Sequence, residues 1–104
     1  MKTIINSVVI SLLLVAQGVL AGAPEVKFHP VNPEMQLPFS EAVQVGHTLY
    51  LSGQLGYDAA AGKLVEGGII AETRKTLENI KATLEKHGAS MSVVVKCSVF
   101  LAEI

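Results

Sequence analysis

Apolar and polar residues alternate in short runs through the first half of the chain, a pattern typical of β-strands. Residues 42–45 and 48–52 are two such runs, and Gly46-His47 joins them. Glycine at the first of two loop positions is the signature of a type II′ hairpin, because glycine accepts a positive φ without steric cost. Residues 26–28 predict a further short edge strand. The pattern therefore predicts a small antiparallel sheet.

A different period marks the clearest element, a helix predicted over residues 69–87. Apolar positions recur there every three or four residues, which places them on one stripe of an α-helix. Gly88 follows directly and suits the left-handed position at which many helices end. Because the stripe must be covered, we expect Leu77 and Ile80 to be buried against the sheet. The stripe comprises Ile70, Thr73, Leu77, Ile80 and Leu84.

Alternation returns in residues 93–101, which predict a long strand after the helix. We expect Val95 and Val99 to join the core, and Cys97 to be a buried small apolar side chain rather than a reactive thiol. The opposite face mixes polar and apolar residues, so it requires a partner, either a ligand or another subunit. That face carries Val94, Lys96, Ser98 and Phe100.

The predicted order β-β-β-α-β gives an α+β fold with the helix on one face of the sheet. A single helix covers only part of one face of a sheet of this size. A chain of roughly 80 residues after removal of a leader is also marginal for burial. We therefore expect either an oligomer or a fragment of a longer protein.

Residues 1–23 are predicted to be a signal peptide, and residues 24–104 the domain itself. Lys2 supplies the positive end, and an apolar run follows that is short for a membrane span. Small residues around Ala21 and Ala23 offer cleavage sites. The predicted location is the periplasm or the exterior, with membrane contact only through the leader. An uncleaved N-terminal anchor is the alternative.

Composition excludes several kinds of partner and site. Eight Lys and Arg against nine Asp and Glu give a net charge of −1, which argues against nucleic acid as a partner. A single cysteine excludes a disulfide within the chain and a cysteine-based zinc site. The three histidines, His29, His47 and His87, lack the spacing of metal ligands, so no metal site is predicted.

Five segments together resemble the RidA/YjgF family, also labelled L-PSP endoribonuclease. The resemblance runs through most of the chain after the predicted leader, and the segments agree with the family in order and spacing. They are residues 38–43 (PFSEAV), residues 45–56 (VGHTLYLSGQLG), residues 73–80 (TRKTLENI), and residues 88–90 (GAS) with 94–101 (VVKCSVFL).

The resemblance implies a chorismate mutase-like fold that assembles as a homotrimer. It implies hydrolysis of reactive 2-imino acids and their enamine tautomers to 2-oxo acids and ammonia, with no cofactor and no metal. The partner would be a small imino acid or a related carboxylate. An older family label implies an endoribonuclease or translation inhibitor.

The family also implies the site residues. Ser52 and Gly53 would bind substrate at a cleft between subunits. Phe39 would line the pocket where typical members carry a tyrosine, so a hydroxyl is lost there. In the family, a second helix and two further strands carry the arginine that binds the substrate carboxylate and an acidic residue that positions water. Both would lie beyond Ile104, so no catalytic residue is assigned within this sequence.

Arg74 is the only arginine in the sequence, and its helix position places it on the solvent-facing side. We therefore expect this chain by itself to be inactive as a deaminase. A non-catalytic ligand-binding or interaction role on the same fold is the alternative. An endoribonuclease is a weaker alternative because the chain has no basic stripe.

Overall fold

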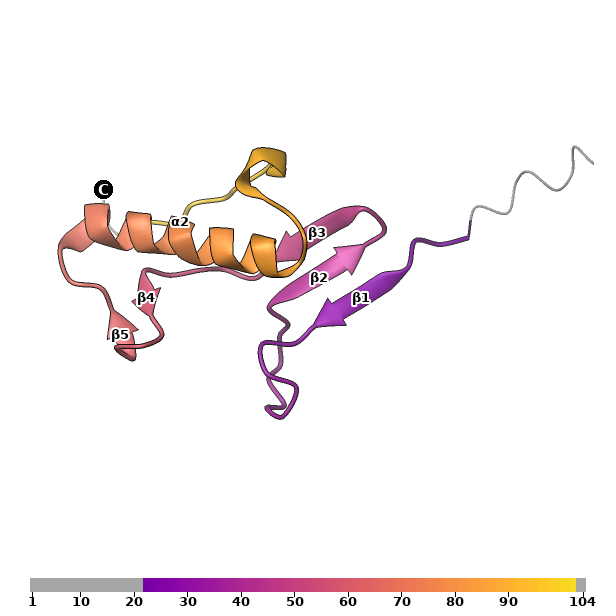
Figure 1. Cartoon of the computed structure of the whole chain (residues 1–104), viewed down its shortest axis with the longest axis horizontal. Helices are drawn as coiled ribbons and strands as arrows, with labels where there is room; N and C mark the ends of the chain where they lie inside the picture. The colour runs from indigo at the N-terminus through magenta and orange to yellow at the C-terminus, as the bar shows by residue number, and fades with distance from the viewer. Residues whose placement is uncertain (1–21, 103–104) are drawn as a thin grey trace, which may run out of the picture.

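The structure is a computed structural model that describes residues 22–102. The predicted signal peptide therefore lies, except for its last two residues, outside the described part of the chain. The α+β class is confirmed: strands precede a single long helix in the described residues. Figure 1 shows the helix beside the three-stranded sheet.

Three strands form an antiparallel meander in the order β1-β2-β3. They are β1 (Val26–His29), β2 (Ala42–Val45) and β3 (Thr48–Leu51). Val45 pairs with Thr48 across the two-residue turn, and Gly46 has a φ of 56°. No non-glycine residue in the described part has a positive φ. This combination fits the predicted type II′ turn, because a type I′ turn needs positive φ at both central residues.

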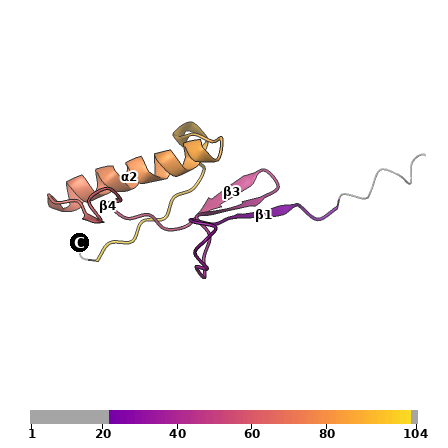
Figure 2. The same cartoon turned by 60° about the horizontal axis from the view of Figure 1, so that its bottom comes forward.

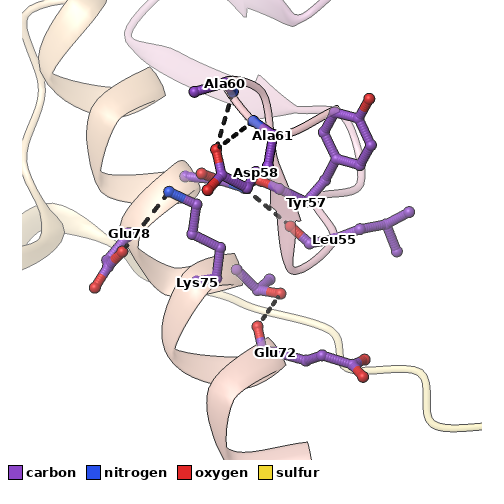
Figure 3. Close-up of polar contacts among 10 residues, drawn as sticks. Leu55, Tyr57, Asp58, Ala60, Ala61, Glu72, Lys75 and Glu78 are labelled. Atoms are coloured by element: carbon purple, nitrogen blue, oxygen red, sulfur yellow. Dashed lines mark hydrogen bonds and ion pairs between the residues drawn. The ribbon is translucent and has the colours of Figure 1, made fainter. Parts of the chain in front are cut away.

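A second, smaller hairpin follows the sheet. It pairs β4 (Tyr57–Asp58) with β5 (Lys63–Leu64). The carboxylate of Asp58 closes the intervening turn, since its Oδ1 accepts hydrogen bonds from the backbone N–H of Ala60 (2.9 Å) and Ala61 (3.3 Å). These two bonds also lower the pKa of Asp58. Figure 3 shows the closed turn.

Helix α2 (Gly68–Lys86) matches the predicted helix closely. It ends as predicted at Gly88, whose φ is 76°. The N–H of Gly88 donates to the carbonyl of Glu85 (3.1 Å), and that of Ala89 donates to the carbonyl of Leu84 (2.9 Å). This pair of bonds is the Schellman motif, which satisfies the last free carbonyls of a helix. No helix in residues 22–102 is long and apolar enough to cross a membrane.

The core is small and lies where the C-terminal end of α2 meets the start of β2. In the described part, Ala42 (1% exposed), Leu84 (5%) and Thr83 (7%) are buried there. Gly56 is also buried, but nearer the other end of α2, against Glu72. Figures 1 and 2 agree that the C-terminal end of α2 is the one that approaches the sheet. The rest of the helix extends away from β1–β3 instead of lying across them.

The predicted burial of the helix stripe is wrong for Leu77 and incomplete for Ile80. Leu77 is 46% exposed, and Ile80 is half-buried. Both side chains lie on the predicted face of α2, but that face borders an open groove and not a covering sheet. Helical period fixes which side chains share a face. It does not supply the surface that covers them.

The predicted strand at residues 93–101 is also absent from the structure. A short 3-10 helix, η2 (Met91–Val93), is followed by residues 94–102 without regular structure. Val95 is 95% exposed and Val99 75% exposed, and Cys97 is an exposed free cysteine. A strand forms only when a neighbouring backbone accepts its hydrogen bonds, and no described strand pairs with this segment. It runs back along α2 in both views (Figures 1 and 2).

Candidate functional site

An open groove of about 1900 Å³ is formed by three segments of the described chain. Its walls are β3 with residues 52–56, the apolar side of α2, and residues 93–102. Most of its surface is apolar, with Thr73, Thr76 and Glu72 on the helix wall. A mostly apolar concavity with a few polar groups is the usual form of a small-molecule site.

Ser52 and Gly53, two of the three predicted substrate-binding residues, lie together in this groove. The N–H of Ser52 donates to the carbonyl of Glu41 (3.0 Å), which fixes the end of β3. A methyl group placed on Gly53 would meet no atom within 4 Å, and its φ is not in the left-handed range. The chain itself therefore does not require glycine at this position, and the Gly53 backbone is left open to the groove.

The loop after Gly53 is held tightly against the helix. A Cβ on Gly56 would come within 2.7 Å of the Cα and carbonyl oxygen of Glu72, so only glycine permits this approach. The amide of Asn79 donates to the carbonyls of Leu55 (3.0 Å) and Tyr57 (2.9 Å). Figure 3 shows this loop beside the helix. Together these contacts set the distance between two walls of the groove.

Phe39, the third predicted site residue, lies elsewhere. It borders a separate, shallow apolar pocket of about 480 Å³ together with Phe28, Pro38 and Val43. Ser52 and Gly53 are neighbours in sequence and both line the groove, whereas Phe39 does not. In a single chain, Phe39 contributes to a different surface from the groove.

A polar cluster anchors the C-terminal end of α2 to the sheet, and we call Glu41, Lys86 and His87 the clamp. Glu41 Oε2 lies 2.6 Å from Lys86 Nζ and 3.3 Å from His87 Nε2. Burial raises the pKa of Glu41, but the hydrogen bonds and charges of Lys86 and His87 outweigh it and hold this pKa below its usual value. The ring of His29 lies 4.5 Å from that of His87, tilted by 50°.

The charged residues of the groove are few. Lys96 is the one lysine or arginine among its described lining residues, and Glu72 is a carboxylate on the helix wall. Arg74 is exposed on α2, as predicted, and does not line the groove. Among residues 22–102 no group of three or more metal-ligating side chains converges.

Sequence reasoning missed Gly56, Asn79 and the clamp. Asn79 left a weak signal, because asparagine is a poor residue for a helix interior and often has a tertiary partner there. Glu41 and His87 left none, since 46 positions separate them in the sequence. Only the fold brings them together.

The α+β layout, with a β-meander followed by a hairpin and one long helix, is consistent with a chorismate mutase-like domain. A family model described as Endoribonuclease L-PSP matches residues 30–104. The chain therefore belongs to this family, which is the RidA/YjgF family.

Relatives of known sequence support the same family. A RutC family protein of Pyrococcus abyssi is 40% identical over 82 residues, which are 79% of this chain and 65% of the relative. A 2-iminobutanoate/2-iminopropanoate deaminase of Dermatophagoides farinae is 44% identical over 69% of this chain and 56% of the relative. The corresponding deaminase of Capra hircus is 48% identical over 64% of this chain and 49% of the relative.

A solved structure agrees with the fold. A Thermotoga maritima protein described as a candidate endoribonuclease has a TM-score of 0.50 and 39% identity. The match covers 66% of this chain and 52% of that one. Across these sequence relatives, the chain spans from about half to just under two thirds of their length.

Proposed function

We propose that this protein acts on reactive 2-imino acids of the 2-iminobutanoate and 2-iminopropanoate type. The observation that carries the proposal is the open backbone of Gly53 beside Ser52 in the groove. Membership of the family and the names of two deaminase relatives support the choice of ligand class.

The reaction is a hydrolysis. Water adds to the carbon of the C=N bond, the nitrogen is protonated and leaves as ammonia, and a 2-oxo acid remains. In this proposal Ser52 and the Gly53 backbone bind the imino acid. The apolar side of α2, including Leu77 and Ile80, holds its short alkyl chain.

The substrate carboxylate needs a cation, since an unpaired carboxylate in an apolar groove is costly. Lys96 is the one lysine or arginine among the described residues that line the groove, and a lysine offers a point charge on a flexible stem. It therefore holds a carboxylate less firmly than the two parallel hydrogen bonds of an arginine would. We therefore propose that the 104-residue chain by itself binds the carboxylate weakly and is inactive or nearly so as a deaminase.

The second candidate is a ligand-binding protein of the same fold that performs no chemistry. The observation that favours it is the absence of arginine from the described groove lining. An endoribonuclease is less favoured, because a net charge of −1 gives little attraction for a phosphate backbone.

The proposed function also includes the assembly of the protein and its location in the cell. We infer a homotrimer of the domain formed by residues 24–104, because the family resemblance implies one. Exposed apolar side chains of β1, α2 and residues 93–102 in the single chain fit contact with another subunit. Examples are Phe28 (69% exposed), Ile70 (74%), Val95 (95%) and Phe100 (94%). Residues 1–23 would direct export to the periplasm or the exterior, with no other membrane contact.

The test is an assay with 2-iminobutanoate generated in place, following 2-oxobutanoate formation above the uncatalysed rate. This chain is compared with a version extended by the C-terminal part of a deaminase relative. Turnover only in the extended version supports the deaminase. Binding without turnover in both versions supports the second candidate. Equal turnover in both would show that a residue of this chain, such as Lys96, already holds the carboxylate.

A further inference from the structure

Glu41 connects three elements through its backbone and side chain. Its N–H donates to the carbonyl of His29 at the end of β1 (2.8 Å), and its carbonyl accepts from the N–H of Ser52 at the end of β3 (3.0 Å). Its carboxylate meets Lys86 and His87 at the end of α2. One residue therefore links the candidate ligand site to the helix that forms the opposite wall of the groove.

The side chain of Glu41 is mostly shielded from water, whereas that of its partner Lys86 is 56% exposed. The Glu41 side chain is 17% exposed, and that of His87 is 11% exposed. A second lysine–glutamate pair, Lys63 with Glu66, has the same 2.6 Å separation, but the glutamate there is 85% exposed. Charge-assisted hydrogen bonds contribute more where solvent is excluded, so the two pairs differ in effect despite equal length.

The groups that face this carboxylate come from two elements. Lys86 and His87 belong to the end of α2, and His29, at the end of β1, lies against the ring of His87. Glu41 supplies the negative charge among these basic side chains. Neutralising it would leave Lys86 and His87 side by side without an anion, which weakens the attachment of the helix end.

We propose that Glu41 is a positioning residue, which holds Ser52 and Gly53 at a fixed distance from α2 through its ionised carboxylate. The consequence for ligand binding rests on the proposed function, whereas the consequence for the Ser52 backbone does not. The carboxylate acts through the clamp and touches no ligand.

The experiment measures amide hydrogen exchange by NMR on the full chain and on the Glu41→Gln variant. Glutamine keeps the volume and the backbone bonds of residue 41 but removes the charge. We expect the Ser52 amide to exchange about tenfold faster in the variant, the factor that loss of one charge-assisted hydrogen bond gives. Amides of the β2–β3 ladder should change much less.

Three comparisons decide the outcome. Glu66→Gln is the matched control and should leave Ser52 exchange unchanged. Lys86→Gln should accelerate it in the same direction by a smaller factor, because His87 still pairs with Glu41. Acidification should lower the protection of the Ser52 amide against exchange in the native chain. In Glu41→Gln, where this protection is already reduced, acidification should have no such effect. Equal acceleration of all amides, or no change at Ser52, would overturn the proposal.

A titration with 2-oxobutanoate separates this proposal from the proposed function. If the native chain binds the probe and Glu41→Gln binds it several-fold more weakly, both stand. If the native chain does not bind it but Ser52 exchange responds as expected, the ligand assignment fails and the positioning role survives. If the variant binds the probe as well as the native chain, the positioning role is overturned.

Discussion

At the residue scale, two glycines of one loop differ in whether their surroundings require glycine. Gly56 permits the loop to contact the Glu72 backbone, whereas Gly53 faces open space. The sequence identified Gly53, because a glycine at a strand end is a recognisable pattern. It gave no means to identify Gly56, whose role depends on a helix residue 16 positions away.

These two positions give a paired prediction. Gly56→Ala should lower the free energy of unfolding by about 1–3 kcal/mol, because the added methyl group overlaps backbone atoms that cannot rotate away. Gly53→Ala should change stability by less than about 0.5 kcal/mol. Urea denaturation of both variants measures the difference. Equal losses would mean that the loop does not pack on α2 as described.

The pKa of Glu41 leads to a prediction about acid stability. The pKa of Glu41 in the folded chain lies below its value in the unfolded chain, which is about 4.3. Above the unfolded-state pKa, the ionised carboxylate therefore contributes its full stabilisation of the fold. This contribution is lost as the pH falls through the folded pKa. Urea denaturation from about pH 7 down to about pH 3 should therefore show a steeper loss of stability for the native chain than for Glu41→Gln. Parallel curves would contradict the assignment.

At the element scale, sequence and structure agree where an element is specified locally. The Gly46-His47 hairpin and the end of α2 at Gly88 depend on glycine conformations at the turn itself. Residues 93–101 have equally clear alternation, yet they form no strand. Alternation predicts which side chains would share a face of a strand. A strand also needs a neighbouring backbone for its hydrogen bonds, and no described strand pairs with residues 93–101.

Residues of the apolar helix stripe also differ in how much they contribute to the free energy of unfolding. Leu84 is 5% exposed, whereas Leu77 is 46% exposed beside the groove. Leu84→Ala should therefore cost about 2–5 kcal/mol of unfolding free energy, and Leu77→Ala about 1 kcal/mol or less. Thermal and urea denaturation of the two variants make the comparison. These values apply to the single chain. A larger loss for Leu77→Ala would show that the helix is covered in solution, as the proposed homotrimer would cover it.

At the scale of the whole molecule, exposed apolar surface is the dominant property. The apolar sides of α2 and of residues 93–102 border the same groove, and few described residues cover them. Surfaces of this kind in a small domain are usually covered by further chain or by another subunit. The homotrimer that the family resemblance implies is one arrangement that would supply such cover.

The proposed signal peptide gives a prediction at this scale as well. If residues 1–23 are a signal peptide, mass spectrometry of exported material should find an N-terminus near Gly22 or Pro24. A chain with an Ala21→Lys and Ala23→Lys double substitution should be processed poorly, because cleavage needs small residues there. Intact Met1 on a membrane-bound product would instead identify an uncleaved anchor.

We propose above that a small carboxylate ligand binds in the groove at Ser52 and Gly53. An NMR titration of the full chain with 2-oxobutanoate tests it most directly. We predict weak but saturable shifts of the Ser52 and Gly53 amides, reduced in Gly53→Ala, with no comparable shifts around Phe39 and Val43. Saturable shifts confined to the Phe39 pocket, or none at Ser52 and Gly53, would contradict the account.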